Sequence, residues 1–287
     1  MAFVTGNLGD MALRSGDLVE AEKWLRHSLA LSERVNDREH TSWCTVVLAT
    51  ALQNQGNLRE ASASIHRALT VSRVLKSTRC LGFALIAVGD LRVAQAIAAC
   101  KLEASDSNEN ALTNGEPCST HVHKSFRFLL RARATLQKAL ALEGLEAEVM
   151  IEGQLVLASV YFLLGEIEAA REKAMRTLEE ARQQELVRVE ARSQRLLARI
   201  LAAQGEREQA DQYFEQSIQV FREHGMRLDY ARALHGYGVT LLTRSVPGDQ
   251  MYQQGLAYLH EALDVCINCH ASIDQEWIER ILSRYRY

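Results

Sequence analysis

Hydrophobic and polar residues alternate along the chain at the spacing of amphipathic helices, and the pattern recurs every 40 residues. Apolar residues follow one another three or four positions apart up to a turn that contains glycine, and a second segment of the same kind follows. Equivalent positions in both halves of the chain hold large apolar residues at this interval: Phe3, Trp43 and Phe83, then Leu157, Leu197 and Tyr237. Because several sets of positions recur at the same 40-residue interval, the sequence predicts six structural units rather than the two domains that 287 residues alone suggest.

Each unit follows the same local plan. A turn glycine separates its two segments, and an alanine opens the buried side of the second segment. The glycines are Gly16, Gly56, Gly165 and Gly205, and the alanines are Ala21, Ala61, Ala170 and Ala210. Glycine adopts the left-handed conformation of a helix C-terminus at little cost. A small residue lets two helices approach, so each unit is predicted to be an antiparallel helix pair in an all-α solenoid.

These residues resemble the tetratricopeptide repeat, with the best agreement over residues 157–178 and 197–218. The usual repeat has about 34 residues. A 40-residue period with longer helices is similar to the MalT-like repeat region of bacterial signal-transducing regulators and, secondarily, to kinesin light chains. The resemblance implies a right-handed α-solenoid of about six helix pairs with a concave groove. It also implies a non-enzymatic scaffold or sensor that binds a protein or peptide.

The register predicts one solenoid domain over residues 1–287. Its units are 2–41, 42–81, 82–150, 151–190, 191–230 and 231–270, and a capping helix occupies 271–287. The capping helix is expected because Trp277, Ile278, Ile281, Leu282 and Tyr285 form one apolar stripe. The first helix has no such cap, so we expect an upstream domain or a partner to cover it.

The third unit departs from the plan. Its first helix is predicted from Ser77 to Leu102, with Gly89 inside the helix, and its second helix is predicted to begin near Lys124. The inserted loop, 103–123, is rich in Ser, Asn, Thr and acidic residues, and is predicted to be mobile and open to proteases. An alternative makes Gly89 a turn and places a short helix from Leu91 to Leu102, but the 40-residue register disfavours it.

Composition narrows the functional classes. A net charge of -3 disfavours a basic nucleic-acid binder, and 47% hydrophobic residues are enough for a sizeable core. The only prolines, Pro117 and Pro247, fall in the insertions. No secretory signal opens the chain, and its apolar runs are too short for a membrane span. With six cysteines interpreted as reduced thiols, a cytoplasmic protein is expected.

Two sets of cysteines and histidines are candidate metal or haem ligands. Cys266, Cys269 and His270 have the spacing of covalent haem attachment, but they continue a repeat helix and are expected to be packing residues. Cys118, His121 and His123 lie in the inserted loop and lack the fourth ligand of a structural zinc site. No phosphate-binding loop or catalytic constellation stands out. We therefore expect neither enzyme activity nor a cofactor.

Arginines mark the predicted binding site. Offsets of 4, 3 and 4 residues place them on one stripe of a helix, and the next unit repeats two of the positions. The set comprises Arg188, Arg192, Arg195, Arg199, Arg232 and His235. Guanidinium groups suit carboxylates and phosphates. The alternative is a solvated, self-paired face that uses Glu185 and Glu190.

The resemblance places Arg192, Arg195 and Arg199 in the concave groove. Phe3, Trp43 and Phe83 occupy corresponding positions in the first half and are expected to be packing residues. We expect the partner to be a protein or peptide, in particular an acidic one, or a small effector of a bacterial transcriptional or signalling regulator. Reversal of Arg195 and Arg199 to Glu is then expected to abolish partner capture without loss of stability. Nucleic-acid binding through the arginines is the alternative, and it would weaken steeply with salt.

Overall fold

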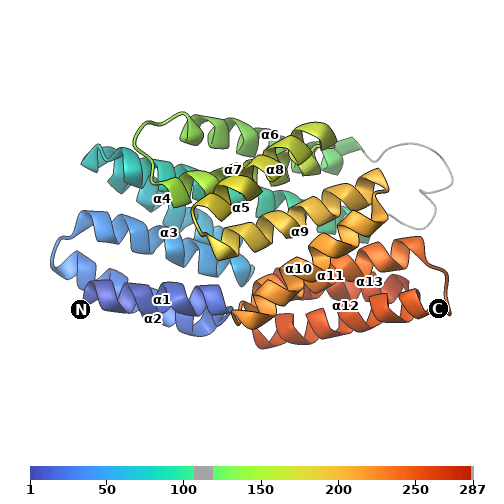
Figure 1. Ribbon diagram of the computed structural model, residues 1–287. Helices are drawn as coiled ribbons and strands as arrows, with labels where there is room; N and C mark the ends of the chain where they lie inside the picture. The colour runs from blue at the N-terminus through green and yellow to red at the C-terminus, as the bar shows by residue number, and fades with distance from the viewer. Residues whose placement is uncertain (107–118, 286–287) are drawn as a thin grey trace.

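The computed structural model describes residues 1–106 and 119–285, and every regular element in these two ranges is a helix (Figure 1). The helices are α1 (Ala2–Ser15), α2 (Leu18–Arg34), α3 (Arg38–Asn54), α4 (Leu58–Leu75), α5 (Thr78–Asp106), α6 (Ser119–Leu140), α7 (Ala147–Leu163), α8 (Ile167–Gln183), α9 (Val187–Gln204), α10 (Arg207–Glu223), α11 (Arg227–Arg244), α12 (Gln250–Asn268) and α13 (Ser272–Arg284). Consecutive helices pack in pairs, so the predicted right-handed α-solenoid is confirmed.

The local plan of the repeat accounts for this pairing. The predicted alanines Ala21, Ala61, Ala170 and Ala210 are completely buried between the two helices of their pairs. Larger residues one turn later, such as Leu25 and Phe214, fill the remaining space and are also completely buried. At the first turn, the Asp17 side chain accepts a hydrogen bond from the Glu20 amide and caps α2. Burial of one apolar face of each helix therefore stabilises the stack.

The third unit contains one long helix, as expected. α5 runs without interruption through Gly89, where an added Cβ would lie 2.5 Å from the Leu136 side chain of α6. Glycine is required there by close helix packing rather than by a turn, and the short-helix alternative is wrong. The two helices extend further than expected, to Asp106 and from Ser119, so both ends of the predicted loop 103–123 are helical. Residues 107–118 lie outside the described ranges.

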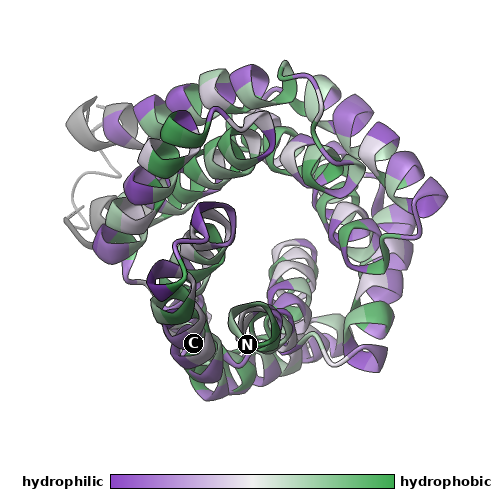
Figure 2. Ribbon diagram, turned by 90° about the vertical axis from the view of Figure 1, so that its left-hand side faces the viewer, coloured by the Kyte–Doolittle hydropathy of each residue, from purple (hydrophilic) through white to green (hydrophobic). Residues whose placement is uncertain are grey.

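The first helices of the pairs form the inner layer of the solenoid. Each of α1, α3, α5, α7 and α9 contacts the next first helix as well as its own partner, and α11 contacts α9 and α12. Viewed close to the helix axes, the pairs form a two-layered ring (Figure 2). Because successive first helices approach one another most closely on the concave side of a curved stack, residues on their free faces point toward the centre of the ring.

The ring closes by contact between the first and the last units. The Arg227 guanidinium of α11 donates a hydrogen bond to the Ser15 carbonyl at the end of α1, over 3.0 Å. The Ser272 hydroxyl at the start of α13 donates to the Gln55 carbonyl after α3, over 2.5 Å. The turns after α1 and α3 therefore meet the starts of α11 and α13, where α1 and α2 approach the last helices in Figure 1.

The two ends of the solenoid differ. α13 seals the last pair, with Ile278 and Leu282 buried against α12, which confirms the predicted capping helix. On α1, by contrast, Val4, Leu8 and Met11 remain exposed along one stripe.

The helix α5 is also apolar enough to resemble a membrane span. By length and composition alone, residues Thr78–Ala99 meet that criterion, although the individual apolar runs of the sequence appeared too short. The helix packs against α3, α4, α6 and α7, and its charged residues Arg79, Asp90 and Arg92 make contacts within the fold. Asp90 accepts a hydrogen bond from the Gln53 amide over 2.8 Å. These contacts are those of a core helix in the solenoid.

Candidate functional site on the inner face

The structure brings the predicted arginines together around a carboxylate that the sequence interpretation did not include. Asp229, in the first turn of α11, is only 5% exposed. Its Oδ2 oxygen lies 3.0 Å from Nε of Arg188, and its Oδ1 oxygen lies 3.2 Å from Nη1 of Arg195. Nε of Arg192 is 3.9 Å from Oδ1. Three arginines of the α9 stripe therefore converge on one carboxylate in the following first helix.

The next unit repeats this relationship. Arg232 of α11 donates to both carboxylate oxygens of Asp274 in the first turn of α13, over 3.0 and 2.8 Å. Its Nη2 nitrogen also donates to Oδ1 of Asn54 at the end of α3. Bidentate contacts of this kind fix a guanidinium in place. We call the group the inner-face cluster; its members are Arg188, Arg192, Arg195, Arg199, Asp229, Arg232, His235 and Asp274.

Burial and charge shift the protonation equilibria of the cluster. Desolvation alone would raise the pKa of Asp229, but the guanidiniums of Arg188, Arg195, Arg192 and Arg232 together outweigh it and hold that pKa far below its ordinary range. Desolvation lowers the pKa of Arg195 to about 10, although Asp229 partly opposes this effect. The arginines and Asp229 are therefore all charged at neutral pH.

His235 is the neutral member of the cluster. Desolvation, reinforced by the nearby charge of Arg199, lowers its pKa to about 4. Its Nε2 atom is buried and has no hydrogen-bond partner. A buried polar atom without a partner is rare and favours a ligand or an ordered water at that position.

Positive charge remains uncompensated on this face. Five arginines face four carboxylates, those of Glu152, Asp229 and Asp274 and that of Asp10 on α1, which acts on Arg188; this leaves an excess of one positive charge. Arg199 is exposed and forms no ion pair in the described part of the chain; its guanidinium stacks over the Phe162 ring at 5.0 Å. The Nε atom of Arg192 is buried and makes no hydrogen bond. The arrangement can accept an anionic group beside Arg192 and Arg199.

The alternative of a self-paired face holds in part, but with different acids. Glu190 pairs with Arg182, over 2.9 Å, and not with the α9 stripe. The true partners, Asp229 and Asp274, each occupy the third position of the following first helix, 41 and 42 residues after the arginines that they bind. In the sequence, an acidic residue about one repeat after an arginine is therefore the pattern that indicates this ion pairing.

This pairing changes the expected effect of charge reversal. Arg195 is 16% exposed, donates to both the carboxylate and the carbonyl of Asp229, and stacks over Phe221. A glutamate at position 195 would place two carboxylates together in a nearly buried environment and would destabilise the protein. For Arg195 we therefore expect a loss of stability on reversal, and Arg199 is the residue whose change leaves the network intact.

Models of the tetratricopeptide repeat match residues 1–74 and 191–224. The chain therefore contains tetratricopeptide repeats. No curated protein sequence matches it at a significant level.

The solved structures that the tetratricopeptide-repeat protein resembles are other helical-repeat proteins. A Rap protein complexed with Competence and Sporulation Factor is 11% identical, with a TM-score of 0.59 over 96% of this chain and 72% of that one. The apo form of RapI is 12% identical, with a TM-score of 0.54 over 99% of both chains. A STAND protein with a tetratricopeptide-repeat sensor from Pyrococcus horikoshii gives 14% identity and a TM-score of 0.47 over 100% of this chain and 42% of that one. At these identities the similarity concerns the fold alone.

The aromatic residues at corresponding positions of the first half serve mainly in packing. Trp43 and Phe83 are half-buried against the main core. Phe3 is 67% exposed but stacks on His40, with ring centroids 5.2 Å apart. His40 in turn stacks on Trp43. The repeat protein therefore uses these rings to join α1 to α3.

Both thiols of the Cys266 and Cys269 pair are buried in the core, which accounts for their helical spacing as packing. Burial raises the pKa of Cys266 to about 12. The second candidate set, Cys118, His121 and His123, lies outside the residues whose side chains are described. Within the described side chains, no group of three or more His, Cys, Asp or Glu residues could hold a metal ion.

A cysteine and a histidine do meet elsewhere, between α1, α2 and α3. Nε2 of His40 lies 3.3 Å from Sγ of Cys44 and 3.0 Å from the Ser28 hydroxyl. Cys44 is completely buried, and desolvation raises its pKa to about 11. Because a reactive cysteine needs an accessible thiolate, this contact is a packed polar cluster and not a nucleophilic centre.

Proposed function

We propose that the tetratricopeptide-repeat protein is a non-enzymatic sensor module that binds an anionic group of a peptide or small effector on its inner face. The observation that supports this proposal is the uncompensated charge of the inner-face cluster. Among the described residues, Arg199 is exposed without an ion pair, and Nε of Arg192 and Nε2 of His235 have no hydrogen-bond partner. A carboxylate or phosphate would supply the missing acceptor and charge.

Ring closure brings both halves of the chain to the inner-face cluster. Asn54 of α3, which lies beside the cluster, and Asp274 of α13 both bind Arg232. A ligand held there would contact helices on both sides of the closure and would bias the relative positions of the first and last units. Such a coupling is what a sensor requires. The fold-level similarity to a Rap protein complexed with Competence and Sporulation Factor is compatible with this role.

The wider setting is also part of the proposal. We place the protein in the cytoplasm, as part of or beside a bacterial transcriptional or signalling regulator, and we treat residues 1–287 as one domain. The thiols of Cys44, Cys80, Cys266 and Cys269 are free, which suits a reducing compartment. The contacts that close the ring join the first and last units into one body.

Calorimetric titration tests the binding proposal. The ligands are a pool of short synthetic peptides with free C-terminal carboxylates and the same pool with amidated C-termini. We expect the free-acid pool to bind and Arg199→Gln to weaken it about tenfold, since a hydrogen bond to a charged group contributes about 1.5 to 3 kcal/mol. Arg207→Gln is the control, because Arg207 is exposed and forms no ion pair within the described residues. Equal binding of both pools by all variants would contradict the proposal.

Nucleic-acid binding through the arginines is the second candidate. It would appear as binding of a single-stranded oligonucleotide whose affinity falls steeply with salt. The carboxylates of Asp229 and Asp274 inside the cluster would repel a continuous phosphate backbone, so we favour a discrete anionic group.

A further inference from the structure

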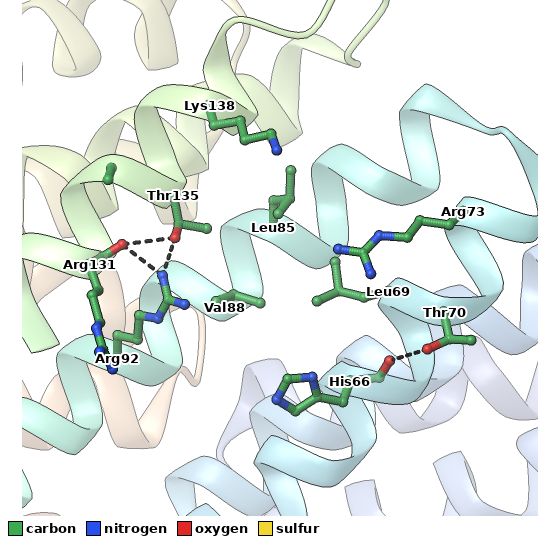
Figure 3. A pocket seen from close by; sticks show the side chains of 11 residues that line it. His66, Leu69, Thr70, Arg73, Leu85, Val88, Arg92, Arg131, Thr135 and Lys138 are labelled. Carbon is green, nitrogen blue, oxygen red and sulfur yellow. Dashed lines mark hydrogen bonds between the residues drawn. The ribbon is translucent and has the colours of Figure 1, made fainter.

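A second surface, distant in sequence from the inner-face cluster, lies between α4, α5 and α6. It is a groove of about 550 Å³ (Figure 3). Its lining residues come from these three helices only: His66, Leu69, Thr70, Arg73, Leu85, Val88, Arg92, Arg131, Ala134, Thr135 and Lys138. None of them belongs to the inner-face cluster. We call this surface the cationic groove.

The charge of the cationic groove has one sign. Arg73, Arg92, Arg131 and Lys138 line it together with His66, and no aspartate or glutamate does. None of these four cations forms an ion pair within the described residues, although many other arginines of the protein do. The helix α6 carries five lysines and arginines and no acidic residue. For a chain with a net charge of -3, this is a local concentration of positive charge.

The groove is partly fixed by its own hydrogen bonds. Nη1 of Arg92 donates to the Arg131 carbonyl, over 2.7 Å, and to the Thr135 hydroxyl. Desolvation and the charge of Arg131 lower the pKa of Arg92. Arg73, Arg131 and Lys138 make no side-chain hydrogen bond in the described ranges and are exposed. Arg92 is thus held in place, while the other cations remain available to a ligand.

The floor of the groove is apolar. Leu69 and Leu85 are each 8% exposed, and Val88 is half-buried between them and Arg92. Figure 3 shows the side chains of Arg73, Lys138 and Arg92 arranged around this floor, each from a different helix. A complementary ligand has carboxylates at its edges and apolar side chains at its centre. Inorganic phosphate or a nucleic-acid backbone would satisfy only the cationic rim.

We propose that the cationic groove is a docking site for an acidic segment of a partner protein, one that carries apolar side chains between its Asp or Glu residues. Apolar side chains of the segment lie on Leu69, Leu85 and Val88, and its carboxylates pair with Arg73, Arg131 and Lys138. Electrostatic attraction speeds the encounter and burial of the apolar side chains stabilises the complex. This site goes beyond the inner-face function and does not require it.

The test measures fluorescence anisotropy with a labelled synthetic peptide that alternates Glu with Leu. We expect the double variant Arg73→Gln and Lys138→Gln to weaken binding by about tenfold or more. Both residues lie in the last turns of their helices. The matched control is Arg34→Gln with Arg284→Gln, because these arginines are also exposed last-turn residues without ion pairs in the described structure. The control removes the same charge and is expected to bind the peptide as the unaltered protein does.

Three further measurements make the outcome decisive. A peptide with Ser in place of Leu must bind more weakly, which shows that the apolar floor is used. A single-stranded thymidine oligonucleotide must not compete at equal concentration. Equal loss in the groove and control variants, or stronger competition by the oligonucleotide than by the peptide, would overturn the proposal. Circular dichroism of each variant separates loss of binding from loss of fold.

Discussion

Nη2 of Arg232 lies 3.0 Å from Oδ1 of Asn54, although 178 residues separate them along the chain. The hydrogen bond joins α11 to the end of α3 and is part of the contact that closes the ring. Because the same guanidinium also holds Asp274, one side chain links the first half of the solenoid, its last pair and its capping helix.

This link predicts a graded loss of stability on substitution. Asn54→Ala removes one hydrogen bond to a charged group and is expected to cost about 1 to 2 kcal/mol. Arg232→Gln also leaves Asp274 without its bidentate partner and is expected to cost about 3 kcal/mol. Urea unfolding followed by circular dichroism measures both. If the ring is one cooperative domain, tryptophan fluorescence will give the same midpoint; two separate transitions would contradict that proposal.

Asp229 is expected to be the most sensitive position of the inner face. Asp229→Asn removes the charge that compensates Arg188, Arg192 and Arg195, and we expect a loss of about 3 kcal/mol or more in the free energy of unfolding. The control is Asp264→Asn, an exposed residue of α12 with no ion pair in the described structure, whose effect should stay within about 0.5 kcal/mol. Similar losses in the two variants would argue against a carboxylate-centred network.

The lowered pKa of His235 predicts how the stability of the protein depends on pH. Its pKa is about 4 in the folded protein, against 6.5 for the ordinary group. Between these values the unfolded chain binds a proton that the folded chain does not, so stability falls as the pH decreases from about 6.5 to about 4. The contribution amounts to at most about 3 kcal/mol. His235→Gln should flatten this part of the profile, whereas His260→Gln, at an exposed position, should leave it unchanged. A profile unaffected by His235→Gln would disprove the assignment.

The turn glycines give a test of ring closure that uses internal controls. Gly16 and Gly56 have φ values of 83° and 92°, and Gly165 and Gly205 have 79° and 82°. Alanine at any of them should cost about 1 to 2 kcal/mol, because left-handed backbone is unfavourable for it. At Gly16 the new Cβ would also lie 3.0 Å from the Leu228 nitrogen, and at Gly56 it would collide with Ser272, whereas the space around Gly165 and Gly205 is open.

We therefore expect Gly16→Ala and Gly56→Ala to lose about 1 to 3 kcal/mol more than Gly165→Ala and Gly205→Ala. Thermal or urea unfolding measures the difference. Four equal effects would mean that the first and last units do not pack against each other in solution.

Much of this architecture was predictable because it depends on short-range rules. The turn glycines, the alanines at close helix contacts and the 40-residue register determine where each pair forms, and even the long α5 followed from the register at Gly89. The α9 stripe was predictable for the same reason, since helical periodicity alone places Arg192, Arg195 and Arg199 on one side. The ends of the inserted segment were not, because helix propagation beyond Leu102 and before Lys124 carries no repeat signal.

The tertiary structure decided which charges compensate one another and which remain free. By itself the sequence determined an all-α tetratricopeptide solenoid with an arginine stripe on α9. The meeting of Arg232 with Asn54 depends on the curvature that accumulates over many units. Small rotations between neighbouring pairs add up along the stack, so contacts between distant units cannot be deduced from the spacing within one repeat. For that reason Gly16 and Gly165, which occupy equivalent positions in the repeat, have different surroundings. Only the folded ring shows that Gly16 lies where the first and last units meet.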